Sequence, residues 1–193
     1  MPLIPLTAEH LEHILPWRNA PAVRRAMYNQ HEISRNEHLA WFERLKGDNT
    51  KQWYVYQDEA GEPQGVVYFT DINREQQTAF WGFYARPEAA SGTGLSILMD
   101  ALDCAFESMG LHKVNAEVLN DNPRSLYLHK KVGFIEEGHF REQRLVGSDR
   151  IEIIRLSQLG SEWLDHREKL QRRVSQLIEI KINSTPPSEN AKF

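Results

Sequence analysis

A turn of small residues, Ser91-Gly92-Thr93-Gly94, separates a strand-like run from the start of a helical pattern. The first N–H groups of a helix have no partner within the helix and carry partial positive charge. Glycine leaves room for a ligand to approach these groups closely. The turn is therefore suited to hold an anion, most naturally a phosphate or pyrophosphate, although a plain connector would have the same composition.

Two residues downstream of this turn could do acid–base chemistry. Glu117 lies in residues 113–119, where apolar and polar residues alternate, so it is expected on the polar side of a strand. There it can act as a general base, or it can be an ordinary solvent-facing carboxylate. Asn122 starts the next helical pattern, and His129 is expected to share a helix face with it.

The hydrophobic pattern predicts the elements that must position these residues. A capping box from Ser34 to Glu37 starts a helix that precedes the first strands. The expected elements are helices near 7–15, 21–29 and 35–45, strands 52–59, 65–72 and 78–85, helix 95–109, strand 113–119, helix 123–132, strands 133–146 and 150–156, and helix 161–180. The first three strands should form an antiparallel meander.

This order of elements predicts an α/β (α+β) domain. Its central sheet should be mixed but mostly antiparallel, with about six to seven strands flanked by helices. The length of 193 residues fits a single domain, which we place at residues 1–182. The polar, proline-rich residues 183–193 should form a loose tail.

Composition narrows the choice of partners and compartment. The formal net charge of −4 argues against a nucleic-acid or membrane-surface partner. Cys104 is the single cysteine, so no internal disulfide can form, which fits a cytoplasmic protein. The pattern contains no signal peptide or membrane span, and we expect no metal site.

The glycine turn, Asn122 and the pair Gly133-Phe134 resemble, in their order, the GNAT family of acetyl-CoA-dependent N-acetyltransferases. The resemblance covers about residues 78–156 and implies a GNAT fold with acetyl-CoA as co-substrate. It also implies that the strand before the turn supplies backbone N–H groups to the acyl oxygen. The residues it assigns to the coenzyme are Phe83, Tyr84, Ser91, Gly92, Thr93, Gly94, Leu95, Asn122 and Ser125.

The same resemblance implies that Glu117 is the catalytic base and that His129 stands where the family has a tyrosine acid. An imidazole with a pKa near 6.5 can protonate a leaving thiolate, whereas a structural histidine would only contact the pantetheine arm. Tyr127 lies two residues before His129, about 200° away from it around the helix, and is expected to be a packing residue. A second departure is Ala89, where the family has a glutamine or arginine that contacts phosphate.

Residues 17–42 resemble the UDP-amino-sugar N-acetyltransferases of pseudaminic acid biosynthesis, which modify precursors of flagellin and surface glycans. The resemblance implies transfer of acetyl to the 4-amino group of a UDP-linked 4-amino-4,6-dideoxy sugar. Arg18 would then meet phosphate, and the nucleotide would be held by Met27, Tyr28, Trp41 and Phe80. Ordinary helix packing and a surface charge are the alternatives for these residues.

Other readings of the same sequence remain open. The acceptor could be the N-terminus of a ribosomal protein or a small amine such as a polyamine. Because Ala89 and His129 depart from the family, a non-catalytic acyl-CoA-binding module is a second alternative. Small members of this family often form dimers, so a homodimer is one expectation for the assembly.

Overall fold

A seven-stranded sheet organises the chain, with the strand order β1-β2-β3-β4-β5-β7-β6. The structure is a computed structural model that describes residues 2–170 and 172, so the predicted tail and the end of the predicted last helix lie outside the described residues. The strands are β1 (Leu3–Pro5), β2 (Gln52–Gln57), β3 (Pro63–Asn73), β4 (Thr78–Ala85), β5 (Lys113–Leu119), β6 (Ile135–Val146) and β7 (Asp149–Leu159). Neighbouring strands are antiparallel except β4 and β5, which confirms the predicted mixed sheet.

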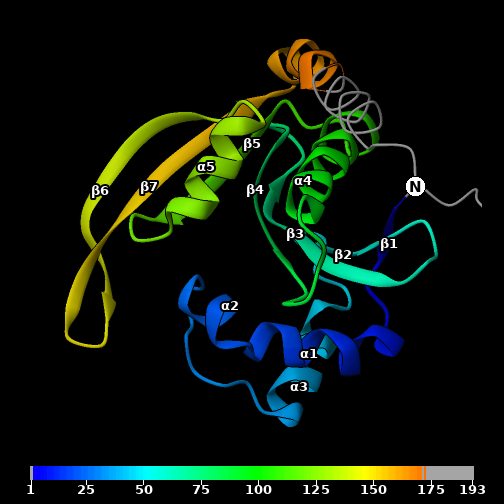
Figure 1. The fold of residues 1–193 in the computed structure, drawn as a ribbon, viewed down its shortest axis with the longest axis vertical. Helices are drawn as coiled ribbons and strands as arrows, with labels where there is room; N and C mark the ends of the chain where they lie inside the picture. Colours follow the sequence, from blue (N-terminus) through cyan, green and yellow to red (C-terminus); the bar gives the residue numbers. More distant parts are fainter. Residues whose placement is uncertain (1, 171, 173–193) are drawn as a thin grey trace, which may run out of the picture.

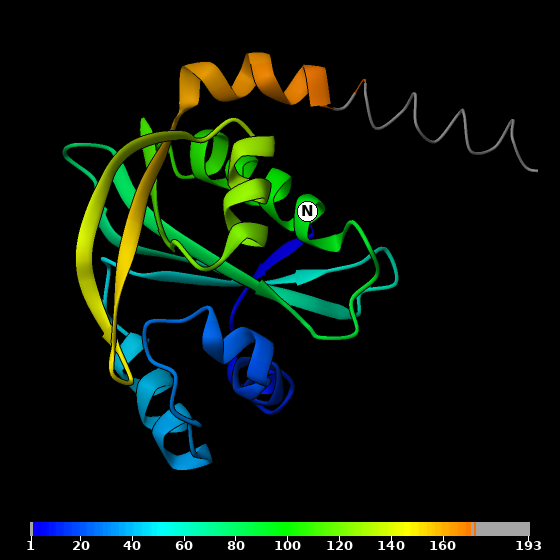
Figure 2. The same cartoon turned by 60° about the vertical axis from the view of Figure 1, so that its left-hand side comes forward.

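Three short helices cover one face of the sheet, as Figures 1 and 2 show. A 3₁₀ turn (Ala8–His10) leads into α1 (Leu11–Asn19), which is followed by α2 (Pro21–Arg25) and α3 (Arg35–Leu45). The predicted capping box is present: the Ser34 hydroxyl accepts from the Glu37 N–H, and the Glu37 carboxylate accepts from the Ser34 N–H. Ile14 and Phe42 pack against Val66 in a core of their own.

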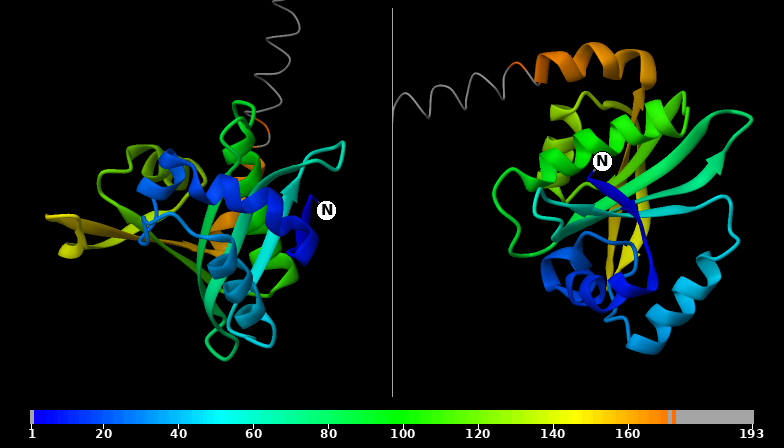
Figure 3. Two further views of the ribbon diagram at one scale, coloured as in Figure 1. Left: turned by 90° about the horizontal axis from the view of Figure 1, so that it is seen from below. Right: turned by 90° about the vertical axis from the view of Figure 1, so that its right-hand side faces the viewer.

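The opposite face carries the remaining helices (Figure 3). They are α4 (Thr93–Asp103), which continues into a π-helical turn (Cys104–Ser108), α5 (Pro123–Lys131), and a helix over residues 160–170. Leu98 and Leu102 of α4 are fully buried against Val67 and Phe69 of β3. Trp163 of the last helix is also fully buried, and its indole N–H donates to Asp103. None of the described helices is long and apolar enough to cross a membrane.

The sheet splits between β4 and β5. These two strands pair only where Thr78–Phe80 lie beside Lys113–Asn115. Beyond Phe80, β4 stays paired with β3 as far as Ala85, while β5 stays paired with β7. The edge of β4 that faces β5 is therefore without a strand partner over its second half, and its backbone groups are available to a ligand.

The clearest differences from the sequence-based expectation lie in β1 and α2. Strand β1 was not expected, because three residues are too few for an alternating pattern, yet it pairs with β2 from Leu3 to Pro5. The helix that begins at Pro21 was expected to reach residue 29 but ends at Arg25. The residues after it form a turn that faces the sheet rather than a further turn of helix.

Candidate functional site

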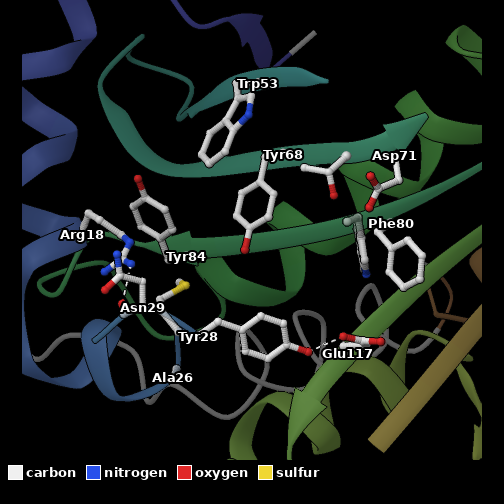
Figure 4. A pocket seen from close by; sticks show the side chains of 13 residues that line it. Arg18, Ala26, Tyr28, Asn29, Trp53, Tyr68, Asp71, Phe80, Tyr84 and Glu117 are labelled. Carbon is white, nitrogen blue, oxygen red and sulfur yellow. Dashed lines mark hydrogen bonds between the residues drawn. The ribbon is translucent and has the colours of Figure 1, made fainter. Parts of the chain in front are cut away.

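A cavity of about 540 Å³ opens between the turn after α2 and the face of the sheet; we call it the aromatic cavity. Figure 4 shows the side chains that point into it. They are Arg18, Ala26, Met27, Tyr28, Asn29, Trp53, Tyr68, Thr70, Asp71, Phe80, Trp81, Tyr84 and Glu117. Four of the predicted acceptor residues, Arg18, Met27, Tyr28 and Phe80, are thus brought together.

Stacked rings form one wall of the aromatic cavity. Trp53 stacks on Tyr68 with ring centroids 4.4 Å apart, and Trp41 packs edge-on behind Trp53 at 4.6 Å. Trp41 is not among the lining residues, and its predicted contact with the nucleotide stays a prediction. Gly82 explains how the Tyr68 ring fits, because a Cβ at this position would lie 2.2 Å from the ring.

Glu117 lies at the floor of the cavity and is held by two partners. Alternation along β5 is as predicted, with Val118 buried on one side and Glu117 on the other. One carboxylate oxygen forms an ion pair with the Arg155 guanidinium at 2.5 Å, and the other accepts a short hydrogen bond from the Tyr28 hydroxyl. The carboxylate therefore has a fixed orientation toward the cavity.

Tyr28 is held in turn by the β6–β7 hairpin, whose tip reaches toward the first helices (Figure 2). Arg144 donates to the Tyr28 carbonyl at 2.9 Å, and its guanidinium lies 4.6 Å from the centre of the Tyr28 ring. Burial, followed by the hydrogen bond to Glu117, raises the pKa of Tyr28 above its ordinary value. The hydroxyl therefore keeps its proton at neutral pH and donates a hydrogen bond to the carboxylate.

Three residues that line the cavity each carry a buried donor with no protein partner among the described residues. Arg18 donates from Nη2 to the Asn29 carbonyl at 2.8 Å, but its Nη1 is buried and unpaired. The indole N–H groups of Trp53 and Trp81 are likewise buried and have no hydrogen-bond partner among the described residues. Because unpaired buried donors are costly, the cavity is suited to a ligand that brings several acceptor oxygens.

A second cavity, of about 290 Å³, lies at the glycine turn, and we call it the glycine-turn cavity. Gly92 caps α4 with a φ of +100°, a left-handed conformation that favours glycine. Asn122 caps α5, and its side chain accepts from the Ser125 N–H at 3.1 Å. Two helix N-termini therefore face one cavity, which suits an anionic ligand.

Most of the residues predicted to bind the coenzyme line this second cavity: Phe83, Tyr84, Thr93, Gly94, Asn122 and Ser125. Ser91 and Gly92 shape the turn without lining the cavity, and Leu95 packs against the core. The sequence analysis missed Arg86 and Arg124, which also line it. These two cations line the same cavity as Ala89, where a phosphate contact was expected to be missing. The sequence could have indicated them, because Arg86 directly follows β4 and Arg124 lies in the first turn of α5.

The two cavities are adjacent. Ala26, Met27 and Tyr84 line both of them, at the level where β4 and β5 separate. A ligand in the glycine-turn cavity can therefore present a group to a second ligand in the aromatic cavity. The described residues hold no cluster of three or more His, Cys, Asp or Glu side chains that could bind a metal.

His129 does not fit the predicted role of a charged proton donor. It is buried, and its ring packs against Trp81, Phe83 and Phe134 at 5.7, 5.9 and 4.9 Å. Burial lowers its pKa to about 4. The hydrogen bond to Ser125 acts in the opposite direction and raises the pKa, but its effect is smaller. Nδ1 lies 2.8 Å from the Ser125 carbonyl, which only accepts, so Nδ1 carries the hydrogen and Nε2 is bare.

The position of Tyr127 on α5 also differs from the expectation. It was expected to pack against the protein, but 62% of it is exposed, and the Lys131 ammonium lies 5.6 Å from its ring. The helix turns this tyrosine away from both cavities. The sequence placed this tyrosine on the correct side of the helix, but it does not pack against the protein, because this face of α5 is not covered.

Comparisons with known proteins agree with this geometry. Residues 1–135 match the profile of the family described as "Acetyltransferase (GNAT) domain". The acetyltransferase PseH of Campylobacter jejuni is 30% identical over 130 residues, which cover 67% of this chain and 79% of that protein. The spermidine N(1)-acetyltransferase of Vibrio cholerae is 29% identical over 122 residues, which cover 63% of this chain and 70% of that protein.

A solved structure extends the likeness to the fold. The crystal structure of spermidine N-acetyltransferase from Vibrio cholerae, in complex with CoA and spermine, superposes with a TM-score of 0.78 at 26% identity. The match covers 84% of this chain and 96% of the other. The predicted fold class is thereby confirmed. The name of the Vibrio cholerae enzyme states an acceptor, spermidine, whereas the name of PseH states none.

Proposed function

The chain belongs to the GNAT family of acetyltransferases, and from this premise we propose that it acetylates the 4-amino group of a UDP-linked 4-amino-4,6-dideoxy sugar. It is an N-acetyltransferase enzyme that takes its acetyl group from acetyl-CoA and transfers it to a small-molecule acceptor. The family assignment removes the alternative of a binding module without turnover. The identity of the amine is the proposed part.

The observation that carries the proposal is Arg18, which lines the aromatic cavity and whose buried Nη1 has no partner among the described residues. A guanidinium fork suits the oxygens of a diphosphate, and the unpaired indole donors of Trp53 and Trp81 can meet further acceptors of a nucleotide sugar. Aromatic side chains offer flat surfaces to a uracil ring. A nucleotide sugar satisfies these groups better than a ligand that brings only donors.

The residues of the chain have distinct parts in the transfer. Acetyl-CoA supplies an activated thioester when it is bound in the glycine-turn cavity. Glu117, on the aromatic-cavity side, accepts the proton of the attacking amine directly or through a water. The free backbone edge of β4, near Phe83 and Tyr84, supplies N–H groups to the acyl oxygen as negative charge develops there.

A polyamine is the second candidate acceptor, and one observation favours it. Asp71 and Glu117 are both carboxylates of the aromatic cavity, and ammonium groups seek such partners. Several relatives are named as spermidine N-acetyltransferases. Arg155, which pairs with Glu117, and Arg18, which lines the same cavity, weigh against it, because they supply the positive charge that a polyamine would otherwise bring.

The test is acetyl-CoA-dependent release of free thiol with three acceptors: a UDP-4-amino-4,6-dideoxy sugar, an N-terminal peptide of a ribosomal protein, and spermidine. Selective turnover of the UDP sugar supports the proposal. Glu117→Gln should lower kcat by about 10²-fold or more without loss of acetyl-CoA binding. Glu152→Gln, on neighbouring strand β7 and outside both cavities, is the matched control. Turnover of spermidine or the peptide alone would overturn the substrate assignment.

A further inference from the structure

We propose that Arg155 determines acceptor specificity: its guanidinium neutralises Glu117 and so keeps polyamines from binding productively in the aromatic cavity. The proposal rests on the proposed function, because it explains how this cavity prefers a nucleotide sugar over the polyamine that related enzymes acetylate. It concerns a residue of β7 that does not itself line the cavity.

The position of Arg155 is fixed by the sheet. Glu117 of β5 and Arg155 of β7 are directly opposite one another in the antiparallel register. The guanidinium lies 4.5 Å from the centre of the Phe80 ring and 5.3 Å from that of Phe140. Contacts with these two rings help to hold the cation in place, so its pairing with Glu117 does not depend on a flexible surface arrangement.

The ion pair is partly withdrawn from water. Each of the two side chains is about a quarter exposed, at 26% for Arg155 and 25% for Glu117. Charges interact more strongly here than on an open surface. Removing the guanidinium would therefore change the potential in the cavity more than removing an exposed arginine.

Positive charge outweighs negative charge around the aromatic cavity. Its lining holds the carboxylates of Asp71 and Glu117 and the cation Arg18, and two further cations stand next to it, Arg155 behind Glu117 and Arg144 on the Tyr28 ring. Burial raises the pKa values of the three lining tyrosines, which are therefore neutral: Tyr28, Tyr68 and Tyr84. A polyamine would bring several ammonium groups into a cavity that has no net negative charge to receive them.

Arg155→Gln is the decisive change, because it removes the charge and keeps a polar side chain of similar length. Glu117 then faces the cavity without its ion-pair partner, and the electrostatic potential there becomes more negative. We expect the dissociation constant for spermidine, measured by calorimetry on the full chain, to fall at least tenfold, which corresponds to about 1.4 kcal/mol. The kcat/KM for spermidine should rise relative to that for the UDP sugar.

Three variants make the result specific. Arg155→Lys keeps the positive charge and should reject spermidine as the wild type does. Arg150→Gln removes an exposed arginine from the same strand and should leave both acceptors unaffected. In the double variant Arg155→Gln/Glu117→Gln the gain in spermidine binding should disappear, since the freed carboxylate is its cause.

The outcome separates this proposal from the proposed function. If folded Arg155→Gln, checked by its thermal unfolding, binds spermidine no better than the wild type, the specificity role is overturned whichever acceptor the enzyme uses. If the wild type turns over neither the UDP sugar nor spermidine, the proposed function fails by itself, whereas turnover of spermidine by the wild type contradicts both proposals. A gain in Arg155→Gln that persists without Glu117 would also contradict the proposal.

Discussion

At the scale of single residues, His129 shows how burial decides chemistry. A sequence position assigned to a proton donor holds an imidazole whose pKa is about 4, with its one hydrogen committed to the Ser125 carbonyl. At pH 7 the cationic fraction is on the order of one in a thousand. The leaving thiolate, whose thiol has a pKa of about 8.5, can instead take its proton from water.

We therefore expect His129→Gln to keep kcat within a few-fold of the wild type at pH 7. A loss on the order of 10²-fold, measured with saturating substrates, would return the residue to the role of general acid. A second readout is stability. The folded-state pKa lies below the unfolded value near 6.5, so the contribution of His129 is complete above pH 6.5 and is lost as the pH falls toward 4.

Chemical unfolding between pH 7 and pH 4 measures that loss. The wild type should lose about 3 kcal/mol through this group, while His129→Gln should lack this component. Equal pH dependence in the two proteins would mean that the imidazole takes up its proton as easily in the folded chain as in the unfolded chain. If His129→Gln loses activity only under conditions in which it also unfolds, the role of His129 is structural.

At the scale of elements, the glycine turn is the feature that sequence reasoning identified most directly. Gly94 lines the glycine-turn cavity, and a Cβ there would lie 3.5 Å from a Leu128 methyl, which is an ordinary contact. Alanine should therefore be tolerated, whereas an indole would occupy the cavity. We expect Gly94→Trp to abolish acetyl-CoA binding and Gly94→Ala to retain it.

Calorimetry with acetyl-CoA measures this difference, and circular dichroism with thermal unfolding shows whether each variant is folded. Undiminished binding by Gly94→Trp would mean that the coenzyme does not occupy this cavity. The glycine turn and the N-termini of α4 and α5 together form the anion-binding side of this cavity. Arg86 and Arg124 complete the same charged rim.

Local patterns predicted much of the fold and part of the site. The capping box at Ser34, the meander and the alternation around Glu117 depend on residues close in sequence, and all are present. The partners of Glu117 could not be found this way. Arg155 reaches it only through the register of β5 with β7, and Tyr28 only through a turn held by a distant hairpin.

At the scale of the whole molecule, the split of the sheet between β4 and β5 brings two substrates together. The strands separate after Phe80, and the cavities on either side meet at Ala26, Met27 and Tyr84. One cavity has helix N-termini and cations, and the other has aromatic rings and a fixed carboxylate. The topology of the sheet thus gives each cavity its own set of groups. The expected homodimer stays a prediction, and neither cavity needs residues of a second chain for the arrangement described.

Ala26 tests whether the junction is the place of transfer. It ends α2 in a right-handed helical conformation that any residue can adopt, so Ala26→Phe is compatible with the backbone there. A phenyl ring would stand between the two cavities and hold the reacting groups apart. We expect kcat to fall on the order of 10²-fold or more, because small misplacements of reacting groups cost that much.

Ala22→Phe is the matched change, since Ala22 lines the glycine-turn cavity alone. It should raise the KM for acetyl-CoA while kcat at saturation stays within a few-fold of the wild type. Steady-state kinetics with both substrates varied separates the two effects. If Ala26→Phe retains the wild-type kcat, the two cavities do not serve one reaction, and the acceptor must approach the thioester from another side of β4. A kcat that falls only in Ala26→Phe would place the transfer where the sheet divides.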